Sequence, residues 1–254
     1  MQIRVLGSGA SDGWPNPWCS CHSCAAAREQ GVRRGQSSVL LDDRVLVDLG
    51  PTAAVHGGDL SGVSVVLVTH EHVDHHFGQA WVWRSWARGT RPLTVLAPPG
   101  VLRDARLGQD VTALTVQPGE RHEVDGYAVR VLEAKHTPQS VLYDITGPDG
   151  GTLLYASDTG VLPASTVEAV RDRAFDVVLL ELAGLPLPTH LTLETWPAQV
   201  ERLRAVGAVT DATQLLATHL GHDNPPPDEL DRLLAGLGAR ACRDGDLLET
   251  SGRR

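Results

Sequence analysis

The sequence has no long apolar stretch. Although 42% of its 254 residues are hydrophobic, no run reaches the roughly 18 residues that suggest a membrane-spanning helix. The segment 2–6 reads as a short strand and lacks the continuous apolar core of a signal peptide. We therefore expect a cytoplasmic protein that does not bind membranes. The hydrophobic fraction also excludes a disordered chain.

Positive charge is scarce. The chain has 22 basic and 31 acidic residues, a formal net charge of −9 and a pI of about 5.6. Proteins that bind nucleic acid normally present a basic face, so the composition disfavours nucleic acid as a partner. This exclusion is partial, because bound divalent cations would add positive charge inside a cleft.

Internal repeats, low-complexity tracts and linkers are missing as well. The length suits one large domain, and we expect residues 1–254 to form it. Hydrophobic runs and turn residues predict the secondary structure of the rest of the chain. Strands are expected over 38–41, 45–49, 63–68, 93–96, 111–116, 119–124, 127–132, 141–146, 153–156, 176–180 and 214–218, and helices over 51–56, 77–86, 98–107, 163–171, 193–206 and 225–237.

A dense group of metal-ligand residue types follows one buried strand. The apolar run 63–68 is followed within a few positions by His70, His72, Asp74 and His75. Imidazole and carboxylate groups suit zinc or a similar first-row divalent metal. Alternate residues of an extended chain point the same way, so His70 and His72 can share one ion. Asp74 and His75 can then reach a second ion.

This His-x-His-x-Asp-His pattern resembles the metallo-β-lactamase superfamily. The resemblance implies an α/β fold (α+β in some schemes), a four-layer αββα sandwich with the metals at one end of two β-sheets. It also implies further ligands at strand ends, and His136, Asp158 and His219 each follow a predicted strand. By the resemblance, one metal would take His70, His72 and His136, the other would take Asp74, His75 and His219, and Asp158 would bridge the two.

Three of the four cysteines lie close together, at Cys19, Cys21 and Cys24. In a cytosolic chain such spacing favours a metal site over a disulfide. Three thiolates need a fourth ligand to close a tetrahedral zinc site. The candidates are His22, Cys242 and His222; we favour His222, because it lies three residues after His219, and three reduced thiols without metal remain the alternative.

With the Gly-rich turn 7–13 and the segment 36–40, the knuckle at 19–24 resembles the PhnP-type branch of the superfamily. These proteins are phosphodiesterases that act on cyclic phosphates. The resemblance implies a structural zinc on the three cysteines and His222, and two zinc, manganese or iron ions at the main site. It also implies a small phosphodiester as the substrate, and the habit of the family suggests a homodimer. The pyrroloquinoline-quinone biosynthesis protein B has a similar knuckle, so the knuckle alone leaves the reaction open.

His190 lies outside the seven-ligand set, after a loop rich in Gly, Pro and Leu. In the resembling phosphodiesterases a histidine in this region contacts the phosphate and assists the leaving group. We therefore expect Asp74 and His190 to be catalytic, Asp74 as a metal ligand and His190 as a general acid. The alternatives are a simple phosphate contact by His190 and an ordinary loop histidine without a role in the reaction.

Other hydrolases of the superfamily fit the sequence less well. One group of lactamases has Cys where this chain has Asp158, and thioester hydrolysis of the glyoxalase II type would need a longer helical segment after His219. A transfer-RNA nuclease would need a basic arm, and a diiron oxygen reductase would have an acid in place of His72. Hydrolysis of an ester, lactone or thioester, and a small-molecule carrier, stay open as alternatives.

Overall fold

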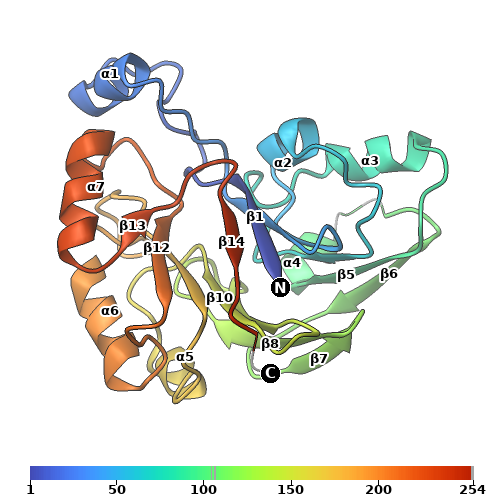
Figure 1. The fold of residues 1–254 in the computed structure, drawn as a ribbon. Coiled ribbons are helices and arrows are strands. Elements are labelled where there is room, and N and C mark those ends of the chain that lie inside the picture. The colour runs from blue at the N-terminus through green and yellow to red at the C-terminus, as the bar shows by residue number, and fades with distance from the viewer. Residues whose placement is uncertain (104, 106, 253–254) are drawn as a thin grey trace.

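Two β-sheets pack face to face in the computed structural model, which describes residues 1–103, 105 and 107–252. Each sheet has seven strands among these residues. Helices lie on the outer faces of both sheets, and α1 projects beside the sandwich (Figure 1). The expected four-layer αββα arrangement is therefore confirmed.

The first sheet has the strand order β14-β1-β2-β3-β4-β5-β6. Strands β3 to β6 are parallel to one another, whereas β1 pairs antiparallel with both β2 and β14. The strands are β1 (Gln2–Gly7), β2 (Ser38–Leu41), β3 (Val45–Val47), β4 (Val65–Leu67), β5 (Leu93–Ala97), β6 (Val111–Thr115) and β14 (Leu247–Glu249).

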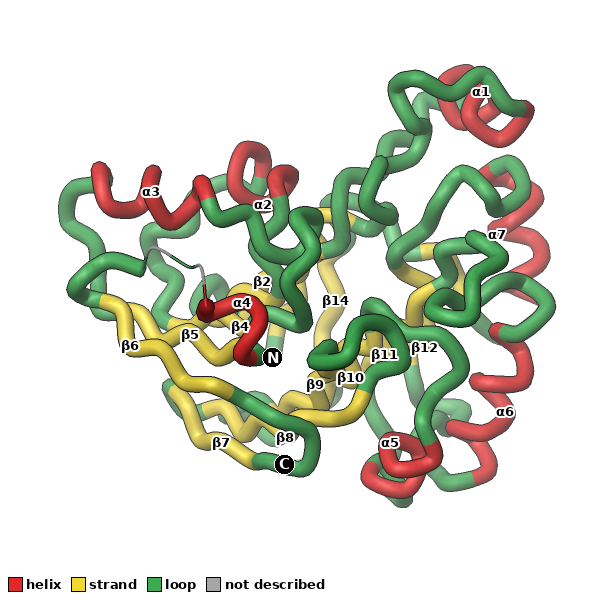
Figure 2. Tube along the Cα trace, turned by 180° about the vertical axis from the view of Figure 1, so that it is seen from behind, coloured by secondary structure: helices red, strands yellow, loops and turns green. Residues whose placement is uncertain are grey.

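The second sheet has the order β13-β12-β11-β10-β9-β8-β7. Strands β10 to β13 are parallel, and β7, β8 and β9 form an antiparallel meander (Figure 2). The strands are β7 (Arg121–Val124), β8 (Tyr127–Glu133), β9 (Val141–Thr146), β10 (Thr152–Ala156), β11 (Val177–Glu181), β12 (Gln214–Thr218) and β13 (Arg240–Ala241).

The central strands are apolar on both faces because both faces are covered. In β10, Leu153 and Tyr155 face the other sheet, while Leu154 and Ala156 face the helices. Strands of this kind read as continuous apolar runs rather than as an alternating pattern. Each fully buried Leu or Val contributes about 1.5–3 kcal/mol to the free energy of folding relative to an exposed one. The apolar layer between the two sheets, and the layer between each sheet and its helices, therefore hold the sandwich together.

Two groups of helices cover the sheets. The first sheet is covered by α2 (Pro51–His56), α3 (Gln79–Trp86) and α4 (Pro99–Arg103), and the second by α5 (Ala164–Ala169), α6 (Trp196–Ala205) and α7 (Pro227–Gly236). α1 (His22–Glu29) packs against α7. None of the helices in the described residues is both long and apolar enough to cross a membrane.

Most predicted elements are found within a few residues of their expected bounds. The helix expected over 98–107 ends as α4 at Arg103; residues 104 and 106 lie outside the described residues. α1 was not predicted, because it begins at His22, inside the cysteine cluster. The thiol of Cys21 stabilises the first turn of this helix by accepting a hydrogen bond from the amide of Cys24.

The direction of the strands determines where the polar side chains gather. Parallel strands end at the same edge of a sheet, so β3 and β4 deliver the residues that follow them to one edge, and β10, β11 and β12 do the same in the second sheet. The segments after these strands contain Asp48, His70, Asp158 and His219, and Glu181 is the last residue of β11.

Candidate metal centre

The loop of residues 69–76, called the metal loop below, follows β4 and is held from several sides. Tyr143 donates a hydrogen bond of 2.7 Å from its hydroxyl to the carbonyl oxygen of Val68, directly before the loop. Gly50 packs so closely that an added Cβ would lie 2.0 Å from the carbonyl oxygen of Asp74. Only glycine permits this approach.

Three histidines form the first donor group. The rings of His70, His72 and His136 lie 4.6 to 4.8 Å apart, centroid to centroid, in edge-to-face arrangements. His136 Nε2 lies 3.0 Å from His72 Nδ1. One nitrogen from each ring falls within 4.8 Å of the others, a spacing that allows all three to bind one ion.

The second donor group consists of Asp74, His75, Asp158 and His219, all buried. His75 Nε2 lies 3.2 Å from Asp74 Oδ2, and His219 Nδ1 lies 3.0 Å from Asp158 Oδ1. His219 has φ 53°, a left-handed conformation that costs about 1–3 kcal/mol in a residue other than glycine. Such strain is typical of functional sites.

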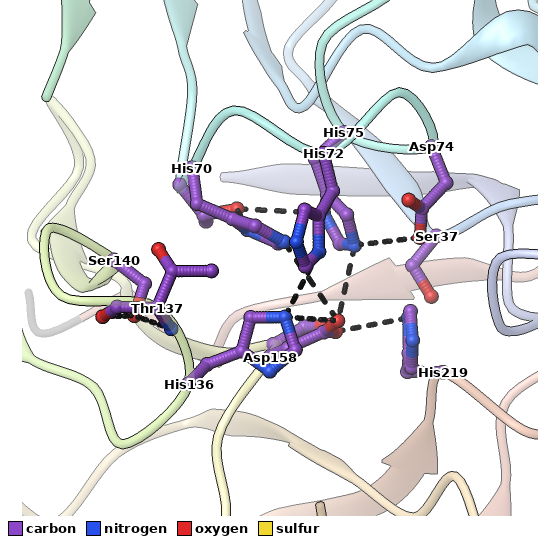
Figure 3. Close-up of polar contacts among 12 residues, drawn as sticks. Ser37, His70, His72, Asp74, His75, His136, Thr137, Ser140, Asp158 and His219 are labelled. Carbon is purple, nitrogen blue, oxygen red and sulfur yellow. Dashed lines mark hydrogen bonds and ion pairs between the residues drawn. The ribbon is translucent and has the colours of Figure 1, made fainter. Parts of the chain in front are cut away.

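Asp158 lies between the two groups (Figure 3). Its Oδ2 is 3.7 Å from His136 Nε2 and 4.0 Å from His70 Nε2, while its Oδ1 is 3.5 Å from His75 Nε2. Each carboxylate oxygen therefore faces a different donor group. The structure thus brings together all seven residues expected at this site, in the expected two sets.

The donor set fits divalent metal ions. His70 Nε2, His75 Nε2 and His219 Nδ1 are buried and have no hydrogen-bond partner among the described residues, and buried polar atoms are normally paired. Burial lowers the pKa of His219 to about 4 and that of His70 well below its usual value. His70 and His219 are therefore neutral, the form in which histidine binds a metal. Burial also lowers the pKa of His75, but Asp158 and Asp48 outweigh burial and raise it well above its usual value.

The two carboxylates are ionised. Burial raises the pKa of Asp158, but the neighbouring His219 and His75 outweigh this effect and hold it well below the usual range. Asp74 likewise has a lowered pKa, because the attraction of His75, whose Nε2 lies 3.2 Å from Asp74 Oδ2, outweighs its burial. Neutral imidazoles at His70 and His219, with ionised carboxylates at Asp74 and Asp158, are protonation states that a cationic centre requires.

Asp48 supports the metal loop and was not predicted from the sequence. It is fully buried, and its Oδ2 lies 2.6 Å from His75 Nδ1. Its Oδ1 accepts a hydrogen bond of 2.8 Å from the amide of Thr69, and Tyr155 donates to Oδ2 over 3.2 Å. The contact between Asp48 and His75 Nδ1 orients the His75 ring with Nε2 toward the centre. Metal-binding histidines are commonly oriented in this way by a carboxylate on the other ring nitrogen. An acid directly after the apolar run of β3 was the available signal.

Glu181, at the end of β11, was also missed, and it positions His190. Glu181 is fully buried and its Oε1 lies 2.5 Å from His190 Nδ1. Burial raises the pKa of Glu181 to about 7. Burial lowers the pKa of His190, but the hydrogen bond to Glu181 outweighs this and raises it. The ring of His190 lies 4.8 Å from that of His136, beside the metal-ligand candidates.

The three clustered cysteines and His222 also converge. His222 Nδ1 lies 3.7 Å from Cys19 Sγ and 3.8 Å from Cys21 Sγ, and Cys24 completes a group within 4.8 Å. A hydrogen bond from the amide of Cys24 lowers the pKa of Cys21 to about 6. Among the described residues this group includes neither His22 nor Cys242, the other fourth-ligand candidates.

A cleft of about 530 Å³ opens onto both donor groups. Five of the seven ligand candidates, all but His70 and His75, line it with His190. The other lining residues are Ala10, Ser11, Asp12, Val73, Ala183, Leu185, Gly221, His222 and Asp223. Ser11 and Asp12 belong to the Gly-rich turn 7–13. This turn therefore lies beside the candidate metal centre.

Known proteins resemble this chain in sequence and fold. A UPF0173 metal-dependent hydrolase of Nitratidesulfovibrio vulgaris (strain DP4) is 31% identical over 159 residues, which cover 61% of this chain and 64% of that protein. The chain thus spans less than two thirds of that relative. The crystal structure of a diphosphatase from the PhnP family has 26% identity and a TM-score of 0.77, over 97% of this chain and 96% of that one.

Zinc-bound PqqB from Methylobacterium extorquens shares the fold, with 20% identity and a TM-score of 0.75 over 98% of this chain and 100% of that one. The sequence profile of the family described as "Beta-lactamase superfamily domain" matches residues 43–220. This range contains the metal loop, Asp158 and His219, and it exceeds half of the chain. The chain belongs to the β-lactamase superfamily.

Proposed function

We propose that this protein is a dinuclear metal hydrolase that cleaves a small, cyclic phosphodiester. The observation that carries the proposal is the position of Asp158, which presents one carboxylate oxygen to each of two converging donor groups. A carboxylate that bridges two ions is typical of sites that hydrolyse phosphate esters. The names of two similar proteins, a metal-dependent hydrolase and a PhnP-family diphosphatase, agree with this chemistry.

Zinc, manganese or iron ions would be held by the two donor groups described above. Two such ions in one site supply a nucleophile from water at neutral pH and stabilise negative charge on the phosphoryl group. The protein's own contribution is to fix the ligands. Asp48 orients His75, and the carbonyl oxygen of Thr189, 3.3 Å from His136 Nδ1, orients His136 with Nε2 toward the centre.

His190 is proposed as the group that protonates the leaving alkoxide. Glu181 holds its Nδ1, so Nε2 is the atom available to the cleft that His190 lines. A histidine with a raised pKa stays protonated near neutral pH and can act as a general acid. Because His190 acts on the leaving group in this scheme, its removal should slow turnover without loss of metal.

The proposal also includes a structural zinc on Cys19, Cys21, Cys24 and His222, from the distances between their ligand atoms. One alternative function is hydrolysis of an ester, lactone or thioester in the same cleft. Another is a carrier of the PqqB type, which would bind a small molecule without turning it over. A carrier has no need of Asp158 between two donor groups.

The experiment compares substrates and variants. The purified protein, supplied with manganese or zinc, should hydrolyse bis-p-nitrophenyl phosphate and leave nitrocefin and a thioester intact. His190→Ala should retain its metal by elemental analysis and lose about 10²- to 10⁴-fold in kcat, the usual contribution of general acid–base catalysis. His56→Ala, at an exposed position on α2, is the control and should change neither value. Faster turnover of the thioester, or loss of metal from His190→Ala, contradicts the proposal.

A further inference from the structure

A second pocket, separate from the cleft, lies on the outer face of the first sheet. Its volume is about 320 Å³, and it shares no lining residue with the cleft. Its floor contains Leu46, Val66 and Leu93, from the neighbouring strands β3, β4 and β5, and α2 and α3 flank it on this side of the sheet (Figure 1). Protein interiors are close-packed, and pockets that bind small molecules have volumes from about 300 Å³ upward. The size of this pocket is therefore that of a ligand site rather than of a packing defect.

The aromatic wall of this pocket is fixed in place. Trp81 and Trp83, both from α3, line it. Trp81 is buried, and its Nε1 donates a hydrogen bond of 2.9 Å to His76 Nε2. The ring of Trp83 packs edge-to-face against that of Phe77, with the centroids 5.4 Å apart. Ligand pockets are usually preformed and lined by hydrophobic and aromatic side chains, and this pocket has both properties.

The charged residues among those described at this pocket are all arginines: Arg84, Arg88 and Arg91. Both terminal nitrogens of Arg84 lie 2.9 Å from the carboxylate of Asp110, and Nη2 also donates a hydrogen bond to the carbonyl oxygen of Arg91. The side chains of Arg88 and Arg91 are exposed and have no hydrogen-bond or ion-pair partner in the part of the chain that the structure describes. In a chain with a net charge of −9, this local positive charge beside an apolar floor favours an anionic ligand.

We infer that this pocket binds a free medium-chain fatty acid, that is, a single apolar chain with a carboxylate at one end. The chain lies against the floor formed by Leu46, Val66 and Leu93, and the carboxylate meets Arg88 and Arg91 at the exposed side. Arginine recognises carboxylates through paired, charge-assisted hydrogen bonds. The volume is near the lower end of ligand pockets, which suits one acyl chain rather than the two of a membrane phospholipid. The site is independent of the function proposed for the metal centre.

Titration calorimetry of the metal-loaded protein tests this inference. Decanoate should bind, and decyltrimethylammonium, which has a similar tail and the opposite charge, should bind at least about tenfold more weakly. From hexanoate to decanoate, each added methylene should tighten binding about fourfold, the factor expected when one methylene is buried. A large excess of acetate should not displace decanoate, whereas it would displace a carboxylate that binds only at the metal centre.

Two variants locate the binding. Arg88→Gln combined with Arg91→Gln should weaken decanoate binding about tenfold, the order that two partly solvated ion pairs contribute. Arg33→Gln combined with Arg121→Gln is the control: it removes the same charge from exposed arginines that do not line this pocket, and the affinity should not change. Ala54→Leu, on the α2 side, places a larger side chain in the pocket and should also weaken binding. Circular dichroism and metal content check that each variant is folded.

Absence of decanoate binding, equal binding of the two amphiphiles, or displacement by acetate overturns the inference. An affinity that the double arginine variant leaves unchanged overturns it as well, and this arm decides the question if Ala54→Leu does not fold. Vesicles of phosphatidylglycerol provide the last comparison. If the protein binds them through Arg88 and Arg91 and does not bind decanoate, these arginines meet a membrane surface and the pocket is not a fatty-acid site.

Discussion

Replacing Asp48 by Asn tests how the metal loop is held. Four donors converge on its carboxylate: the amide and hydroxyl of Thr69, the hydroxyl of Tyr155 and, at 2.6 Å, Nδ1 of His75. Asn has nearly the same size but only one acceptor oxygen, so its NH₂ group must face a donor. Asp48 has φ 62°, and Asn tolerates this conformation well. The substitution therefore changes the hydrogen bonds and leaves the backbone unstrained.

The expected loss has two parts. One mispaired, fully buried polar group should lower the free energy of unfolding by about 1–3 kcal/mol. With His75 no longer fixed by a carboxylate, the affinity for the second metal should fall about 10- to 100-fold. Urea unfolding of the metal-free protein measures the first quantity, and competition with a chelator measures the second.

Asp43→Asn is the matched control. Asp43 also has a positive φ, 55°, but it is exposed and its carboxylate pairs only with Arg4 among the described residues, at 2.8 Å. Surface ion pairs contribute about 0–1 kcal/mol, so stability should change little and metal affinity should not change. If Asp48→Asn behaves like this control in both assays, the carboxylate does not hold the metal loop and the reasoning is refuted.

Three further changes test other parts of the site. Glu181→Gln removes the carboxylate that raises the pKa of His190. Since His190 must be protonated to act as the general acid, kcat is lost as the pH rises through the pKa of His190. The alkaline limb of the kcat–pH profile should therefore move to lower pH in the variant. An unmoved limb would argue against the pairing. Gly50→Ala should lower metal content severalfold, because its Cβ collides with the metal loop, whereas Gly78→Ala, with open space around the added Cβ, should not. Cys24→Ser should release the proposed structural zinc, seen as one fewer zinc per chain by elemental analysis; an unchanged zinc content contradicts that site.

The fold was predictable from the sequence because its central strands are covered on both faces. Most residues of the runs 141–146 and 214–218 are apolar, without a polar residue at every second position, and the structure forms β9 and β12 over these same residues. α1 was not predictable in this way. It has no apolar periodicity strong enough to mark a helix, and it begins at a cysteine whose role as a cap becomes visible only in three dimensions.

The ligand candidates were predictable because they belong to residue types that bind metals and follow strands in a family-like order. The acids behind them were not. Asp48 follows an apolar run, but so do Asp42 and the exposed Asp43, so this signal alone does not distinguish it. Its importance comes from complete burial against His75, which depends on how β3 and β4 pair.

Glu181 and Asp158 show the same dependence on topology. Glu181 ends β11 and Asp158 follows its parallel neighbour β10, so the two residues emerge at one edge of the sheet although they are far apart in the sequence. Asp158 faces the two donor groups, and Glu181 accepts a hydrogen bond from the amide of Thr159 and holds His190. A single pair of parallel strands thus connects the residue proposed to bridge the metals with the residue proposed to protonate the leaving group. Since a shift of one residue in this pairing would turn each side chain to the opposite face, the register of β10 and β11 determines the distance between the two proposed catalytic functions.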